Sequence, residues 1–509
     1  MNKRNATLAV LSVVICIFGR INAVADNDTF LGNYAGNSNT TGSKNVFLGN
    51  YAGFTNDTGY QNTFLGFSAG YFNTQGYKNT FLGAYAGREN TSGNFNSFIG
   101  HAAGYTNKSG AFNTFLGYCA GYENDKANGN TFIGYCAGNK NETGDANTFL
   151  GYAAGYKNTT GYGNTFLGGS AGYKNTNGYY NTFLGQGAGY ANSEGFRNTF
   201  LGYGAGYKNE KGNYNTFLGY AAGYKNTEGY GNTFLGENSG FTNEKGFSNT
   251  FLGTCAGYAN TDGNQNTYLG NCAGFCNTKG DNNTCIGNYA GYTNTEGDYN
   301  TFLGSLTGNS NTTGRHNAFM GYAAGYNNTE GYKNTYLGNY AGYKNAQGDF
   351  NVFLGYKAGY NETGSNKLYI ANGPSDDAVL MYGDFAADRI GIHTTNPQGT
   401  LDVNGTIYQR GSRLHADYVF QPNYRLESIE KHAAFMWREK HLSSLPKAVV
   451  DTQGNEVINV GDHRRGVVEE LEKAHIYIDQ LNEKNKALSK NVAQLEERIA
   501  RLEKLLAVQ

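Results

Sequence analysis

The sequence contains very little proline and tryptophan, and it has almost no net charge. Proline accounts for 4 of 509 residues, tryptophan for 1, and the formal net charge at pH 7 is −1. The balanced charge gives no reason to expect nucleic acid or another highly charged partner. Because proline is scarce and the sequence has no three-residue period, a collagen-like triple helix is excluded. Beyond the N-terminal segment no apolar run reaches about 18 residues, so we expect no membrane-spanning helix in the mature protein.

Glycine and aromatic residues are abundant instead. Glycine accounts for 75 residues, about twice the usual share, and aromatic residues for 15% of the chain. Glycine-rich chains are often disordered, but disordered chains are poor in aromatic residues, which here suffice to build a core. This composition is typical of a repeat protein.

The N-terminus has the pattern of a secretory signal peptide. Lys3 and Arg4 precede an apolar stretch of about 13 residues, and small residues at 23–25 form a cleavage site. We therefore expect residues 1–25 to be removed and the protein to be extracellular or at the cell surface. An uncleaved anchor is the alternative, which Arg20 disfavours because it interrupts the apolar run.

From residue 26 onward, one unit of 17 residues recurs without insertion. Its consensus is N-T-F-L-G-Y-A-A-G-Y-K-N-T-x-G-x-x, and its aromatic position runs from Phe30 to Phe353, which makes twenty units. Such strict self-similarity predicts a solenoid. Two glycines of the unit, two and six residues after the aromatic position, occur in every copy. They indicate turns or close backbone approaches that leave no room for a side chain.

Asparagine and proline support a stacked β architecture. Asparagine recurs two residues before and nine residues after the aromatic position, where it can adopt the left-handed conformation, bond its own turn, or form ladders between coils. The N-T-F-L segment predicts a short strand. The twenty units contain no proline, as expected where every amide donates to a sheet. We predict an all-β repeat solenoid, a parallel β-roll of twenty 17-residue units, over residues 26–365.

The predicted strand has two apolar faces. In N-T-F-L-G the Phe side chain points to one side, and the Thr and Leu side chains point to the other. One face can fill the roll, whereas the other would expose a stripe far larger than a normal surface patch. We predict that further copies of the chain cover this stripe. With coils about 4.8 Å apart, the roll would be on the order of 100 Å long.

The repeat resembles the head repeats of trimeric autotransporter adhesins, the YadA-like left-handed parallel β-roll. As in Asn62-Thr63-Phe64-Leu65-Gly66, those repeats combine a small polar residue, an alternating apolar strand and a glycine turn. The family's unit is shorter, so we expect the coil geometry to differ. The resemblance covers roughly residues 26–365 and implies a homotrimeric adhesive fibre.

The composition changes after the repeats. Residues 366–409 predict a β-hairpin module, since residues 400–407 alternate around an Asn-Gly turn or bulge. Their sequence resembles a segment of tail-fibre-like and bacterial surface proteins, which in some members precedes a self-cleaving chaperone with a catalytic Ser-Asp pair. No Ser-Asp dipeptide follows residue 409, so we do not expect self-cleavage. Residues 410–464 predict a small mixed α/β neck, with a helix around 426–440.

Residues 465–509 predict a C-terminal trimeric coiled coil. Assigning the series that begins at Val467 to heptad position a, and the series that begins at Leu471 to d, puts Leu mostly at a and Ile or Val at d. That combination disfavours a dimer and favours trimers or tetramers, and a polar residue in the seam fixes the register. A helix that packs on its own domain is the alternative. The predicted trimerisation residues are Leu471, Ile478, Leu481, Asn485, Leu488, Val492, Leu495, Ile499 and Leu502.

Two further sets of side chains are candidate sites. Cys119 with Cys136, and Cys255 with Cys272, occupy equivalent positions in adjacent units, within disulfide reach if the coils stack; buried free thiols are the alternative. A tyrosine ladder can form a binding face for sugars or proteins, or can stack to stabilise the coils. The ladder consists of Tyr71, Tyr105, Tyr122, Tyr156, Tyr173, Tyr190, Tyr207 and Tyr224.

The sequence contains no catalytic, metal-ligating or cofactor-binding pattern, and we predict that the protein is not an enzyme. The favoured function is an exported homotrimeric fibre for adhesion or as a surface appendage, with its own copies and a cell-surface, glycan or matrix ligand as partners. The alternatives are a soluble binder of carbohydrate or ice through an exposed Tyr or Thr ladder, and a phage-derived tail-fibre component. The membrane strands of the autotransporter family have no counterpart before Gln509, so we expect the fibre to be released or held by a partner.

Overall fold

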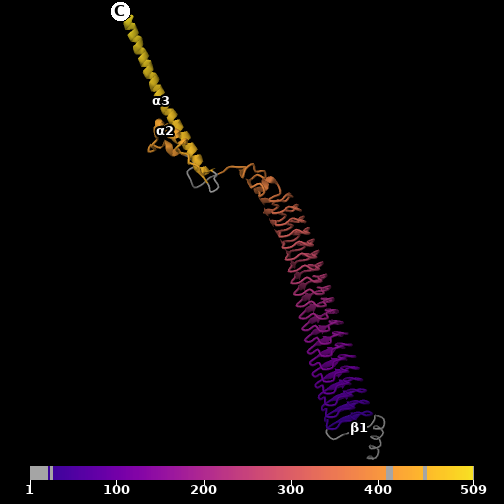
Figure 1. Ribbon diagram of the computed structural model, residues 1–509. Helices are drawn as coiled ribbons and strands as arrows, with labels where there is room; N and C mark the ends of the chain where they lie inside the picture. The colour runs from indigo at the N-terminus through magenta and orange to yellow at the C-terminus, as the bar shows by residue number, and fades with distance from the viewer. Residues whose placement is uncertain (1–20, 23–26, 408–415, 451–455, 508–509) are drawn as a thin grey trace, which may run out of the picture. The chain divides into compact units, whose positions relative to one another are not determined.

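The computed structural model describes residues 21–22, 27–407, 416–450 and 456–507. The predicted signal peptide lies outside these residues except for Ile21 and Asn22. The chain divides into two compact units, Met1–Asn404 and Gly405–Gln509. Figure 1 shows the repeats of the first unit as a continuous β-solenoid and the described part of the second unit as mainly helical.

The first unit is a parallel β-solenoid with one short strand in each 17-residue coil, which confirms the predicted fold. Consecutive strands pair in parallel, so that Thr182, Phe183 and Leu184 lie opposite Thr199, Phe200 and Leu201. A two-residue strand, β1 (Ile21–Asn22), pairs antiparallel with the first repeat strand. The repeat strands are β2 (Thr29–Leu31), β3 (Val46–Leu48), β4 (Thr63–Leu65), β5 (Thr80–Leu82), β6 (Ser97–Ile99), β7 (Thr114–Leu116), β8 (Thr131–Ile133), β9 (Thr148–Leu150), β10 (Thr165–Leu167), β11 (Thr182–Leu184), β12 (Thr199–Leu201), β13 (Thr216–Leu218), β14 (Thr233–Leu235), β15 (Thr250–Leu252), β16 (Thr267–Leu269), β17 (Thr284–Ile286), β18 (Thr301–Leu303), β19 (Ala318–Met320), β20 (Thr335–Leu337) and β21 (Val352–Leu354).

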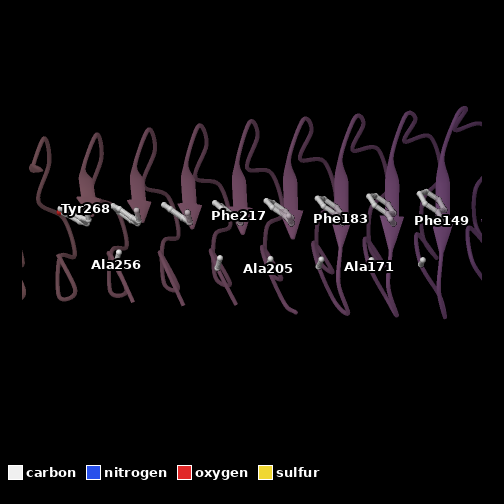
Figure 2. Packing of buried hydrophobic residues seen from close by; sticks show 14 of the residues in the cluster. Phe149, Ala171, Phe183, Ala205, Phe217, Ala256 and Tyr268 are labelled. Atoms are coloured by element: carbon white, nitrogen blue, oxygen red, sulfur yellow. The ribbon is translucent and has the colours of Figure 1, made fainter. Parts of the chain in front are cut away.

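The core of the solenoid is a column of stacked aromatic rings beside a column of alanines. Figure 2 shows the rings of Phe149, Phe183 and Phe217 in one column and Ala171 and Ala205 in the other. Neighbouring rings are nearly parallel; the Phe183 and Phe200 centroids lie 4.8 Å apart, with 4° between the ring planes. Each such pair contributes about 0.5–1.5 kcal/mol beyond the burial of apolar area. The small alanine lets the opposite wall of the coil approach the ring.

Close approach explains both invariant glycines. Gly189 lies against the Phe183 ring, and a Cβ there would be 2.4 Å from Cε2 of that ring. Gly185 has a φ of +134°, and its Cβ would be 2.3 Å from the carbonyl oxygen of Gly202 in the next coil. Any side chain at either position would force a ring or the backbone to move.

Two buried ladders of asparagine side chains run along the solenoid, as the sequence predicts. In one, Nδ2 of Asn175 donates to Oδ1 of Asn158 at 2.7 Å and to the carbonyl of Gly178 at 2.9 Å. In the other, the backbone amide of Asn181 donates to Oδ1 of Asn164 at 2.9 Å. These bonds satisfy polar groups that would otherwise destabilise the interior.

The alternative expectation, that these asparagines adopt the left-handed conformation, is wrong. Between Phe30 and Gly359, the left-handed residues other than glycine lie four and fourteen residues after the aromatic position, for example Ala153 and Ala146. The asparagine side chains instead reach the carbonyl of their own turn and the neighbouring coil, so the sharp backbone bends fall on other residues.

Four strands complete the first unit after the repeats. β22 (Lys367–Ala371) continues the parallel stack, β23 (Val379–Asp384) follows the short helix η1 (Asp376–Ala378), and β24 (Arg389–Ile392) pairs antiparallel with β23. The hairpin predicted within residues 400–407 is wrong, because β25 (Leu401–Val403) is followed by no second strand up to residue 407 and pairs instead in parallel with the earlier strand β24. The hairpin of this module is formed by β23 and β24 instead.

The second unit is mainly helical. It comprises η2 (Asp417–Phe420), α2 (Ile429–Glu439), the antiparallel pair β26 (Val449–Val450) and β27 (Glu456–Val457), and the long helix α3 (Val460–Leu506). The predicted helix around residues 426–440 and the heptad helix are confirmed. α3 begins before residue 465 because the side chain of Asn459 accepts hydrogen bonds from the amides of Gly461 and Asp462.

Cys285 interrupts the aromatic column. It is fully buried at the aromatic position, and the ring of Phe302 in the next coil is tilted by 20° from that of Phe319. We expect Cys285→Phe to raise the free energy of unfolding by about 1–2 kcal/mol, because it restores two ring contacts and buries more apolar area. Urea denaturation under reducing conditions measures the gain. Cys276→Ala, which also removes a thiol but adds no ring, should change little; a loss of stability in Cys285→Phe would show that Phe302 already fills the space.

Candidate binding surfaces

The predicted tyrosine ladder forms columns of stacked, half-buried rings. Tyr190 and Tyr207 have centroids 4.9 Å apart, and Tyr207 and Tyr224 have centroids 5.0 Å apart, with ring planes within 5° of parallel. Stacking therefore occupies the faces of these rings and leaves their edges and hydroxyl groups toward the surface. Burial and the neighbouring phenols raise the pKa of Tyr207 further above neutral pH.

The other predicted tyrosines also contact neighbouring aromatic rings. Tyr156 and Tyr173 continue the same column, Tyr105 stacks on Tyr122, and Tyr71 stacks on Phe54. The stabilising role is therefore evident along the ladder, while a binding role requires a place where a ring is uncovered.

A second aromatic column, which sequence reasoning missed, is more exposed. It lies three residues after the aromatic position and includes Tyr118, Tyr135 and Tyr152, whose centroids are 5.2 and 5.3 Å apart. Tyr203 and Tyr220 form a further stacked pair of this column at 5.3 Å. The sequence signal for this column was the tyrosine that follows the first invariant glycine in many units, as Tyr118 follows Gly117.

A groove opens where this exposed column is interrupted. Gly169 and Gln186 stand at the column position between Tyr152 and Tyr203. The groove has a volume of about 260 Å³. Its lining residues are Gly169, Ser170, Gln186, Gly187, Tyr190, Tyr203, Gly204, Tyr207 and Tyr224.

The outward face of the strands remains uncovered within the chain. As predicted, the Phe side chains point into the solenoid and the Thr and Leu side chains point out, with the side chain of Leu235 44% exposed. This Thr–Leu face extends over β2–β21, so its apolar stripe is much longer than the patches on typical monomers.

The predicted trimerisation residues lie on the surface of α3, and no other part of the described chain covers them. Leu471, Ile478, Leu488 and the remaining apolar members of the set are all exposed, and so is Asn485. A sustained exposed heptad stripe is typical of helices that pair in coiled coils.

The heptad lettering given above has to be corrected. On a helix, position d follows position a by three residues, so the series from Leu471 to Ile499 occupies a and the series from Leu481 to Leu502 occupies d. Ile or Val at a with Leu at d favours two strands, and so does Asn485 at an a position. The seam residues are unchanged, but their preference for three strands over two is lost.

The second unit also contains a buried charged cluster that sequence reasoning missed. Lys473 Nζ lies 2.9 Å from Glu469 Oε1 and contacts the Ser444 hydroxyl, and Glu470 accepts a hydrogen bond from the Ser444 amide at 2.7 Å. Burial by itself would raise the pKa of Glu469, but hydrogen bonds from Tyr418 and Lys473 outweigh it and lower the pKa to about 2. The only available signal was the Glu469–Lys473 spacing of four residues.

This cluster does not form a nucleophilic Ser-Lys pair. Burial disfavours the charge of Lys473, but its hydrogen bond to Glu469 raises the pKa well above the ordinary value. A lysine held in the charged form cannot take the proton of the Ser444 hydroxyl. The cluster therefore fastens the start of α3 to the preceding segment.

The predicted cysteine pairs are adjacent in the structure. Cys119 and Cys136, and likewise Cys255 and Cys272, influence each other's pKa from adjacent coils, and all six described cysteines are free thiols. Burial raises the pKa of each of these four thiols, which lowers the fraction of reactive thiolate. The disulfide alternative stays a prediction, since equivalent positions of stacked coils are about 4.8 Å apart, within disulfide reach.

The surfaces of the molecule are therefore aromatic and apolar ladders. In the part of the chain that the structure describes, no group of three or more His, Cys, Asp or Glu side chains is placed to hold a metal ion. None of the described helices is long and apolar enough to cross a membrane. A comparison of the chain with protein-family models, curated proteins and solved structures finds no match, so its function has to be inferred from these surfaces.

Proposed function

We propose that the protein is an exported homo-oligomeric fibre that serves in adhesion or as a structural appendage of a surface. The observation that supports this most strongly is the presence of two uncovered apolar stripes, the Thr–Leu face of β2–β21 and the heptad seam of α3. Burial of apolar surface at about 25 cal/mol per Å² makes such stripes strong drivers of association.

Further copies of the same chain are the partners that fit both stripes best. The Thr–Leu face repeats with the spacing of the coils over twenty strands, and a second solenoid offers the same length and spacing. The seam of α3 has the heptad spacing that coiled-coil partners share. The resemblance of the repeat to autotransporter heads implies three chains, whereas the corrected heptad lettering favours two.

An adhesive role follows from regular repetition on an exported rod. The N-terminal pattern of a signal peptide supports export. Columns of surface aromatic side chains that recur in successive coils provide many similar contacts, and linked weak contacts bind far more tightly than one. A phage-derived tail fibre would share this architecture.

The mass of the mature chain, residues 26–509, tests the proposal. We expect light scattering after size exclusion to give two or three times the mass of one chain. A single-chain mass at micromolar concentration would contradict the proposal.

Matched variants then locate the interface. Leu488→Asp with Leu495→Asp places charge in the seam, whereas Ala487→Asp with Gln494→Asp adds the same charge outside it. We expect only the seam variant to dissociate the helices, because burying an unpaired carboxylate costs several kcal/mol. A mass that falls to one chain identifies the seam as the main contact, and an unchanged mass assigns that role to the strands.

A further inference from the structure

We propose that the groove beside Tyr203 binds a sugar ring of a neutral glycan. The inference rests on the proposed adhesive function and names the class of ligand and the place where it binds. The groove lies on the coils of β10–β13, and none of its lining residues belongs to the Thr–Leu face.

The groove exists because side chains are missing at its floor. Gly187 and Gly204 stand four residues after the aromatic position in adjacent coils, with φ values of +66° and +62°. Other coils place Ala153 or Ala221 at this position with the same left-handed backbone, so the backbone does not require glycine. A Cβ on Gly187 would lie 3.3 Å from Cε2 of Tyr207, in the space that the groove occupies.

Tyr203 offers a ring face that no aromatic neighbour in its column covers, whereas Tyr190 of the ladder is stacked on both faces. One face of its ring stacks on Tyr220, and the neighbour on the other side of the column is Gln186 instead of an aromatic residue. Tyr203 is 53% exposed. The C–H-rich face of a pyranose packs on such a ring, whose π surface carries partial negative charge.

The remaining lining groups suit the hydroxyls of a neutral sugar. Gln186 supplies an amide, Ser170 a hydroxyl, and the edges of Tyr190 and Tyr207 point their phenols toward the surface; each of these groups can donate and accept hydrogen bonds. None of the nine lining residues carries a charge, which disfavours sulfated or sialylated ligands.

The size of the groove suits one sugar ring. Its volume of about 260 Å³ lies just below the range of about 300–1,000 Å³ typical of sites for larger small molecules. In a homo-oligomer each chain carries one copy, so that multivalent attachment can compensate for weak binding at a single groove.

The test uses the mature chain on an array of neutral, sulfated and sialylated oligosaccharides, followed by titration of the best neutral probe. We expect Gly187→Ala with Gly204→Ala, which narrows the groove with side chains that other coils carry at this position, to weaken binding at least tenfold. Tyr203→Ala should have the same effect. Tyr118→Ala, a change at the same column position outside the groove, should leave binding unchanged.

The outcomes separate this inference from the proposed fibre. Absence of binding to neutral probes, equal binding by the narrowed-groove variant, or a preference for charged glycans overturns the sugar site. The mass of each variant is measured in parallel. An oligomer that binds no sugar would contradict the sugar site and support the fibre. A monomer that binds the neutral probe would support the sugar site and contradict the fibre.

Discussion

Gly236→Ala is expected to disrupt the solenoid, whereas Gly231→Ala, only five residues earlier, should be tolerated. Gly236 has a φ of +134°, and a Cβ there would lie 2.6 Å from the carbonyl oxygen of Gly253. The contact is between two backbones, so no side-chain rotation can relieve it. We expect a loss of about 3 kcal/mol or more in the free energy of unfolding.

Gly231 is the matched control because its conformation is ordinary for this solenoid. Its φ is +64°, the nearest atom to a Cβ would be Ser248 Oγ at 3.7 Å, and Ala146 occupies the equivalent position in another coil. The expected cost is about 1–2 kcal/mol, the usual strain of a left-handed alanine. Chemical denaturation of both variants measures the difference. Equal stabilities of the two variants would mean that the close contact with Gly253 is not the reason why this position of the repeat is always glycine.

Removal of one ring from the core column is expected to have the other large effect. Phe115 is fully buried between Phe98 and Phe132, with centroids 4.7 and 4.9 Å away. Phe115→Ala should cost about 3–5 kcal/mol, because it removes two stacked contacts and leaves a cavity. In a solenoid each coil contacts mainly its neighbours, so the loss should be local and should divide the unfolding transition at this coil.

Phe112→Ala provides the control, since it deletes the same side chain three residues away. Phe112 is 64% exposed and already has the left-handed backbone that Ala146 adopts elsewhere. Its replacement should change stability by less than about 1 kcal/mol. Denaturation followed by hydrogen exchange locates the weakened coil; uniform protection across the solenoid in Phe115→Ala would contradict the expected local loss.

The repeat made the solenoid predictable, because twenty copies of one pattern restrict each position to one kind of environment. The buried column of Phe183 and its equivalents, the parallel register and the asparagine ladders all follow from positions that vary little between units. The module after the repeats was harder, since it occurs once. The alternation around residues 400–407 is compatible with a hairpin or with an edge strand, and only the tertiary pairing with β24 decides between them.

The candidate sites were less predictable than the fold. The groove arises from side chains that are absent at Gly169, Gly187 and Gly204, and a consensus of the repeat averages such local departures away. The Glu469–Lys473 cluster depends on a contact with Ser444, which lies 29 residues before Lys473 in the sequence. The seam of α3 could be identified from spacing alone, but the oligomer preference depended on which series was assigned to position a.

The uniform register between coils makes length an adjustable property of this molecule. Every interior coil donates to and accepts from neighbours that are built alike, as the ladder from Asn158 to Asn175 illustrates. Insertion or excision of one whole unit would therefore create no new kind of contact, and would change the reach of the rod by about 4.8 Å. A change in the number of units therefore alters the length of the solenoid and leaves the fold of each coil the same.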